Sequence, residues 1–171
     1  MPDPIFDQSA VAARLRDALE TMVWASTLVP ARWTHQMPES APGDSWTVAM
    51  NLAHIVTYEK CIGLPLLESL AAGGDGTGVV TFEQSFFDDA QAIATEPIAA
   101  LLEQFRTLRE REIAIVQAYD AARFNSAATD AFNTPMHGNR RHTPAFIATK
   151  SFQHTWEHGN AILRALLFVP D

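Results

Sequence analysis

Two histidines, His154 and His158, stand four residues apart in a helix-like run of the sequence, and this pair constrains the chain more than any other feature. The run spans residues 143–167 and opens with Thr143-Pro144, a capping hydroxyl followed by a proline in the first turn. Residues i and i+4 of a helix share one face, so both imidazoles can point at one spot. The sequence therefore predicts a C-terminal helix that carries two metal ligands.

A catalytic site of the zinc type needs a third protein ligand and an open coordination position, and His54 is the best candidate for that ligand. His54 shares a helical stripe with Thr47, Asn51, Tyr58 and Cys61, which is unusually polar for a surface that faces a core. A single cysteine excludes an intramolecular disulfide and any cysteine-rich zinc motif, which agrees with a reducing compartment. We interpret Cys61 as a core residue and expect histidine and carboxylate to hold any metal.

The composition fits one compact domain over residues 1–171, since 47% of the 171 residues are hydrophobic. A formal net charge of -8 repels phosphate backbones and anionic lipid, so nucleic acid and membrane surfaces are disfavoured as partners. No window approaches the roughly 18 apolar residues of a membrane span, and the N-terminus shows no signal-peptide pattern. We expect a soluble, cytoplasmic protein.

Four amphipathic helices are predicted, over residues 7–29, 46–72, 95–119 and 143–167. Pro30 ends the first. Asp44 or Ser45 can cap the second, and Gly63 and Pro65 should bend or break it midway. Thr95-Glu96-Pro97 is a start signal for the third, with a capping hydroxyl and then a proline. Two long connections, 73–94 and 120–142, are predicted as loops, and part of the first is expected to pack, for example as a short helix.

Four such helices without an alternating strand pattern predict an all-α fold, namely a four-helix bundle. The order of the helices follows from the length of the connection over residues 73–94. A parallel second and third helix needs a connection that spans about 40 Å, and 22 residues reach about 70 Å when extended. The sequence therefore favours an up-down-down-up bundle with a long crossover between the second and third helices.

Together these features resemble the DinB/YfiT-like family of metal-dependent proteins, over nearly the whole chain. The resemblance rests on residues 46–54 (WTVAMNLAH) at the start of the second helix and on residues 154–158 (HTWEH) in the fourth. It implies a four-helix bundle with a crossover, a divalent metal held by His54, His154 and His158, and frequent dimers. It also implies a range of activities, because some relatives are transferases or isomerases that use a low-molecular-weight thiol and many have no assigned reaction.

Two further residues are candidates for catalysis. Tyr58 lies one turn after His54 and is placed to donate a hydrogen bond to a ligand of the metal, although a structural hydroxyl is an equal alternative. Glu157 is offset by about 60° from His154 around the helix. It is therefore a candidate second-sphere acceptor or general base, with a solvated helix charge as the more ordinary alternative.

The leading hypothesis is a metal-dependent enzyme that uses a three-histidine site to activate a thiol or water, with a thiol-dependent transferase ranked first. Zinc or nickel is expected because imidazole suits both. The substrate is then a small molecule, with a low-molecular-weight thiol as co-substrate. The alternatives are a metal-dependent hydrolase and a non-catalytic stress-response binding module. A homodimer is expected from the resemblance and from the aromatic residues Phe82, Phe86, Phe87 and Trp156.

Overall fold

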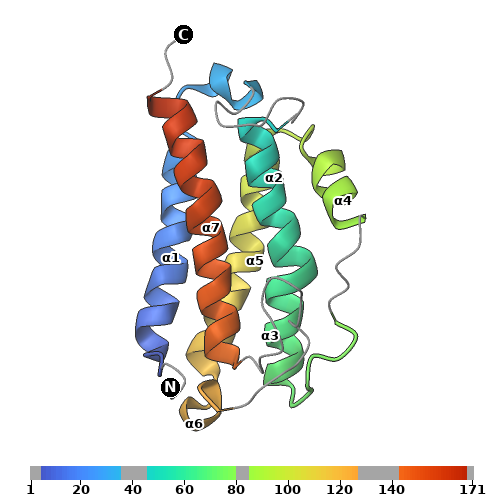
Figure 1. The fold of residues 1–171 in the computed structure, drawn as a ribbon. Helices are drawn as coiled ribbons and strands as arrows, with labels where there is room; N and C mark the ends of the chain where they lie inside the picture. The colour runs from blue at the N-terminus through green and yellow to red at the C-terminus, as the bar shows by residue number, and fades with distance from the viewer. Residues whose placement is uncertain (1–4, 36–45, 80–84, 127–142, 169–171) are drawn as a thin grey trace.

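The computed structural model describes residues 5–35, 46–79, 85–126 and 143–168, and these residues contain helices and no strand (Figure 1). The predicted all-α class is thus confirmed. The elements in chain order are α1 (Gln8–Ala25), η1 (Pro30–Thr34), α2 (Val48–Tyr58), η2 (Glu59–Gly63), α3 (Leu64–Ala71), α4 (Ser85–Ile93), α5 (Ile98–Ala118), α6 (Ala121–Phe124) and α7 (Pro144–Leu167). None of these described helices has the length and apolar character needed to cross a membrane.

Side-chain caps begin α1, α2 and α7. Asp7, Thr47 and Thr143 each accept a hydrogen bond from the backbone N–H three residues later, which satisfies one of the unpaired donors of the first turn. The predicted Thr143 cap and the proline after it are confirmed. Thr47 caps α2, whereas the predicted caps Asp44 and Ser45 lie outside the described residues.

Two helix boundaries differ from the prediction. The first helix ends at Ala25, and Pro30 opens the short 3-10 helix η1, whose Trp33 is buried. The third long helix begins at Ile98 after Pro97, and the predicted cap Thr95 instead donates its hydroxyl to the carbonyl of Ala92. Threonine side chains compete for nearby carbonyls in this way, so a hydroxyl before a proline does not by itself define a cap.

The second predicted helix is continuous in direction but changes its winding. α2 is followed by a π-helical segment, η2, and then by α3, with Pro65 in the first turn of α3. Proline has no N–H to donate to the preceding turn, so a widened turn before it removes the conflict. The predicted interruption at Gly63 and Pro65 therefore takes the form of a π-helical turn.

One connection holds the expected short helix, and the other holds a helical turn that was not predicted. α4 lies within residues 73–94 and packs on α2, in agreement with the expected short helix. α6 forms a single turn at the start of the region 120–142, which was predicted as loop. The aromatic side chains of Phe82, Phe86 and Phe87 lie outside the described part of the structure.

The long helices pack side by side in a closed circuit: α1 contacts α5 and α7, and α2 contacts the same two helices. In Figure 1, α7 lies between α1 and α2, with α5 behind them. Two buried apolar clusters fill the interior, one including Tyr58, Ile62 and Ile147 and the other including Leu52, Ile55 and Ile162. The contact between α2 and α7 is the one that brings the predicted metal ligands together.

Candidate metal centre

His54 on α2 and His154 and His158 on α7 meet at the contact between these helices. Their candidate ligand atoms all lie within 4.8 Å of one another, and the Nε2 atoms of His54 and His154 are 3.0 Å apart. Two nitrogens bound at 2.0–2.1 Å to one tetrahedral ion are about 3.3 Å apart. The structure thus confirms that the three histidines predicted from the sequence form one group that can bind a metal ion.

The surroundings keep these imidazoles neutral. Burial, together with the proximity of His158, lowers the pKa of His54 to about 4 and that of His154 to about 2. Burial also lowers the pKa of His158, against the opposing charge of Glu157. Neutral imidazole is the form that ligates a metal. All three histidines are therefore in their ligating form at neutral pH.

Asn51 orients His158. The Nδ1 atom of His158 lies 2.8 Å from Oδ1 of Asn51, and Nδ2 of the same amide donates to the backbone carbonyl of Thr47. An amide oxygen only accepts, so Nδ1 of His158 must carry the proton and its Nε2 is left as the ligand atom. Sequence analysis placed Asn51 on the inward stripe without a role, and the structure places it beside a ligand as an acceptor.

Aromatic rings surround the three imidazoles. Trp46 meets His54 edge to face at 5.0 Å between ring centroids and stacks on His158 at 5.9 Å. Tyr58 stacks on His154 at 4.0 Å. These ring contacts restrict the imidazole rotamers, so the protein itself holds the three side chains in place.

The two predicted catalytic residues lie in different environments. Tyr58 is buried against His154, and burial together with the charge of Glu59 raises the pKa of its hydroxyl, so this group remains protonated at neutral pH. Glu157 is exposed on α7, where its carboxylate accepts a hydrogen bond from Gln153. Among the described residues, the group that could hold a metal contains no carboxylate.

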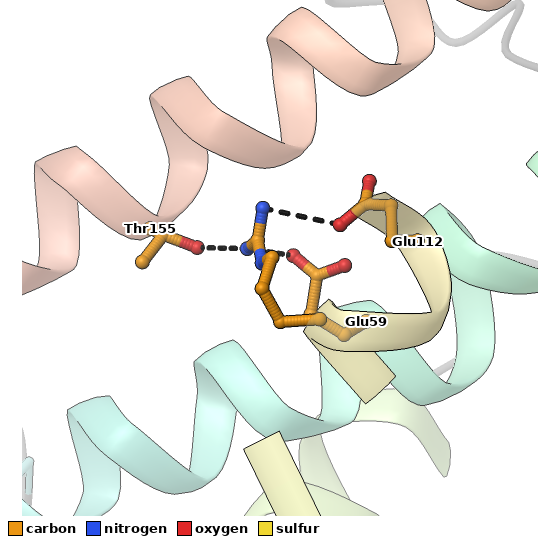
Figure 2. A network of polar contacts seen from close by, with 4 residues as sticks. Glu59, Glu112 and Thr155 are labelled. Carbon is orange, nitrogen blue, oxygen red and sulfur yellow. Dashed lines mark hydrogen bonds and ion pairs between the residues drawn. The ribbon is translucent and has the colours of Figure 1, made fainter. Parts of the chain in front are cut away.

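A second polar group lies in the interior, and sequence analysis did not find it. Arg109 on α5 forms ion pairs with Glu59 on η2 and Glu112 on α5, and it donates a hydrogen bond to Thr155 on α7 (Figure 2). Sequence patterns do not predict such a buried cluster, because a charged residue on an amphipathic helix is usually solvated. The only available signal is the spacing of Arg109 and Glu112, which places both on one face of their helix.

The family model described as the DinB superfamily matches residues 9–162, which include all three histidines and nearly every described helix. Searches among curated proteins and among solved structures gave no significant match. A family match over most of the chain shows family membership without assigning a reaction. The chain therefore belongs to the DinB superfamily.

Proposed function

We propose that this protein is a metal-dependent enzyme that activates a small thiol, and that it acts as a thiol-dependent transferase. The observation that supports this most is the convergence of His54, His154 and His158 with two Nε2 atoms 3.0 Å apart. Three neutral imidazoles leave a divalent zinc or nickel ion with its full charge and with open coordination positions. Such an ion lowers the pKa of a thiol or water that reaches it.

The ranking of a thiol above water rests on the surroundings of the histidines. A water-activating site needs a base within hydrogen-bond reach of the attacking water. Glu157, the only acid between the two histidines of α7, is exposed and bonded to Gln153, and the described ligand group holds no carboxylate. A thiol needs only its own deprotonation and an electrophile held nearby. Metal-dependent hydrolysis and a non-catalytic stress-response module are the competing functions.

In this proposal, Tyr58 and Asn51 complete the site. The Tyr58 hydroxyl stays protonated, so we propose it as the group that donates to the substrate, while Asn51 holds His158 in the ligating tautomer. The four long segments are proposed to form an up-down-down-up bundle. The circuit of helix contacts and the colour progression in Figure 1, in which α2–α3 and α5 run opposite to α1 and α7, support this topology.

The test combines metal analysis with an activity screen on protein that carries no affinity tag. The wild type should bind one equivalent of zinc or nickel or less per chain. His54→Ala and His154→Ala should lose it, while the exposed His35→Ala, a matched control, should keep it. The loaded protein should consume cellular thiols in the presence of a generic electrophile. Equal metal content in the wild type and the site variants would exclude the site.

A second arm of the same screen separates the competing functions. Ester and amide substrates are supplied without thiol, and Glu157→Gln is compared with the wild type. Hydrolysis that needs both the metal and Glu157, without thiol consumption, would reverse the ranking. Metal binding without turnover in either arm would favour the binding module.

A further inference from the structure

The cluster of Arg109, Glu59, Glu112 and Thr155 joins three elements in the interior. Nη2 of Arg109 lies 2.6 Å from Oε1 of Glu59 and 2.6 Å from Oγ1 of Thr155, and its Nη1 lies 3.1 Å from Oε2 of Glu112 (Figure 2). The three ionisable side chains are 0% exposed. One guanidinium group therefore connects η2, α5 and α7 without contact with solvent.

The charges of this cluster do not balance if both acids are ionised. Arginine stays protonated inside proteins, so two carboxylates would leave one uncompensated negative charge in the core. The other buried polar side chains of the described residues are Asn, His, Ser and Thr, which carry no compensating charge. An unpaired buried charge is strongly unfavourable, and binding one proton removes it.

We propose that Glu59 and Glu112 share a single proton, and that the resulting neutral cluster makes Arg109 a positioning residue that holds the histidine-bearing helix α7 through Thr155. The part that concerns α7 rests on the proposed function of the histidine site. Thr155 directly follows His154 in the sequence and precedes His158 by three residues. A bond at this point restrains the rotation of α7, and with it the direction of both imidazoles.

The surroundings of Glu59 agree with a retained proton. The groups that face it are Tyr58 from α2, Arg109 and Glu112 from α5, and the hydroxyls of α7. Burial and the charge of Glu112 raise its pKa, against the opposing charge of Arg109. Oε2 of Glu59 and Oε1 of Glu112 also have no hydrogen-bond partner among the described residues, so a proton between the carboxyl groups adds a bond that is otherwise absent.

The shared proton is tested by unfolding metal-free protein at several pH values, with Glu59→Gln as the reference. A proton held only in the folded state stabilises the fold at low pH, and this contribution is lost as the pH rises toward the folded pKa. The unfolding constant of the wild type should therefore rise relative to that of Glu59→Gln, tenfold per pH unit above about pH 5. Glu112→Gln should behave like Glu59→Gln. A constant ratio would overturn the shared proton.

A direct measurement on the wild type covers the case in which these variants fail to fold. In carbon-13 NMR of protein labelled at the glutamate carboxyl carbon, one signal should titrate far above the ordinary range of glutamate near pH 4.3. If every glutamate signal titrates in the ordinary range, the shared proton is excluded.

The positioning role is tested with Co²⁺, whose absorption spectrum reports the ligand geometry. Thr155→Val keeps the size of the side chain and removes the acceptor of Arg109. We expect at least a tenfold loss of Co²⁺ affinity and a changed spectrum, because groups that orient metal ligands typically contribute tenfold to a hundredfold. Thr155→Ser should restore both. Thr149→Val, on the same helix, is the matched control, because among the described residues the Thr149 hydroxyl donates to the backbone carbonyl of Ala145 and not to the cluster.

The outcomes separate this inference from the proposed function. If the wild type binds Co²⁺ and Thr155→Val binds it equally well with the same spectrum, only the positioning role is overturned. If the wild type binds no Co²⁺, both the proposed function and the positioning role are excluded. The carboxyl titration involves no metal and decides the shared proton in either case.

Discussion

The Nδ1 atom of His158 donates its proton to Oδ1 of Asn51 over 2.8 Å, across the contact between α7 and α2. This bond sets the tautomer of a candidate metal ligand from a residue 107 positions away in the sequence. The amide of Asn51 is itself held by the backbone carbonyl of Thr47, the capping residue of α2. The start of α2 therefore determines which ring nitrogen of His158 on α7 is free to bind a metal.

Asn51→Ala should weaken zinc binding by about tenfold to a hundredfold, because His158 loses the acceptor that fixes its ring and tautomer. Asn51→Asp retains an acceptor at the same position and should bind zinc nearly as tightly as the wild type. The exposed Asn160→Ala on α7 is a matched control. Competition with a chromophoric chelator measures the affinities, and an unchanged affinity for Asn51→Ala would show that this bond does not orient the ligand.

The metal-free protein should lose stability in mild acid because of its buried imidazoles. Burial lowers the pKa of His54 to about 4, whereas the unfolded histidine titrates near 6.5, so only the unfolded chain takes up a proton between these values. The stabilisation is present above pH 6.5 and is lost as the pH falls toward 4. For His54 alone it amounts to about 3 kcal/mol.

Chemical denaturation of the wild type and His54→Gln between pH 7 and pH 4 measures this contribution. The free energy of unfolding of the wild type, relative to that of His54→Gln, should decrease as the pH falls from 7 to 4. Histidine ring signals in NMR should show that His54 does not titrate near 6.5. A parallel pH profile for the two proteins would contradict the lowered pKa. This pH dependence is opposite to that expected for the Glu59 and Glu112 pair, whose shared proton stabilises the fold at low pH.

Tyr58→Phe should fold and bind metal but lose activity toward thiol and electrophile. The hydroxyl is buried beside the hydroxyl of Ser151, and the ring stacks on His154. Removing this one neutral contact should therefore change the unfolding free energy by only about 1 kcal/mol. If the hydroxyl donates to the substrate, kcat should fall at least tenfold. Equal kcat values would leave the tyrosine with a packing role.

Gly63→Ala should destabilise the fold by about 1 to 3 kcal/mol, because the added methyl group overfills a closed space. A Cβ atom there would lie 2.6 Å from Oγ of Ser151 and 2.9 Å from Oε2 of Glu59. Gly73→Ser is a useful comparison, since a Cβ atom at Gly73 meets nothing within 4 Å, although its φ of 89° adds backbone strain. A thermal unfolding midpoint for Gly63→Ala at or above that of the wild type would contradict the close packing.

We propose that the protein forms a homodimer through a helical face. Trp156 on α7 remains 52% exposed and Trp24 on α1 51% exposed, which is unusual for residues of this size on a free surface. Light scattering at micromolar concentration should give twice the chain mass of 18.8 kDa. Trp156→Asp should give the mass of one chain. A wild type that is monomeric at every concentration would exclude the dimer.

The local patterns of the sequence determined the helical class, the four long helical segments and the three histidines. Helical spacing and caps act within one or two turns, so they can be read without knowledge of the fold. The pair His154 and His158 is of this kind, since its shared face follows from the rise and turn of one helix. His54 was linked to that pair by the polarity of its stripe and by family resemblance.

The tertiary structure alone decided how far apart the ligands lie, which acceptor orients His158, and where Arg109 is placed. Arg109 lies 50 residues after Glu59 and 46 residues before Thr155, and these residues meet only because η2, α5 and α7 pack together. Helical periodicity assigns a charged residue to solvent by default, whereas burial and pairing depend on partners from other helices. The histidines were therefore predictable from local spacing, and the buried cluster beside them was not.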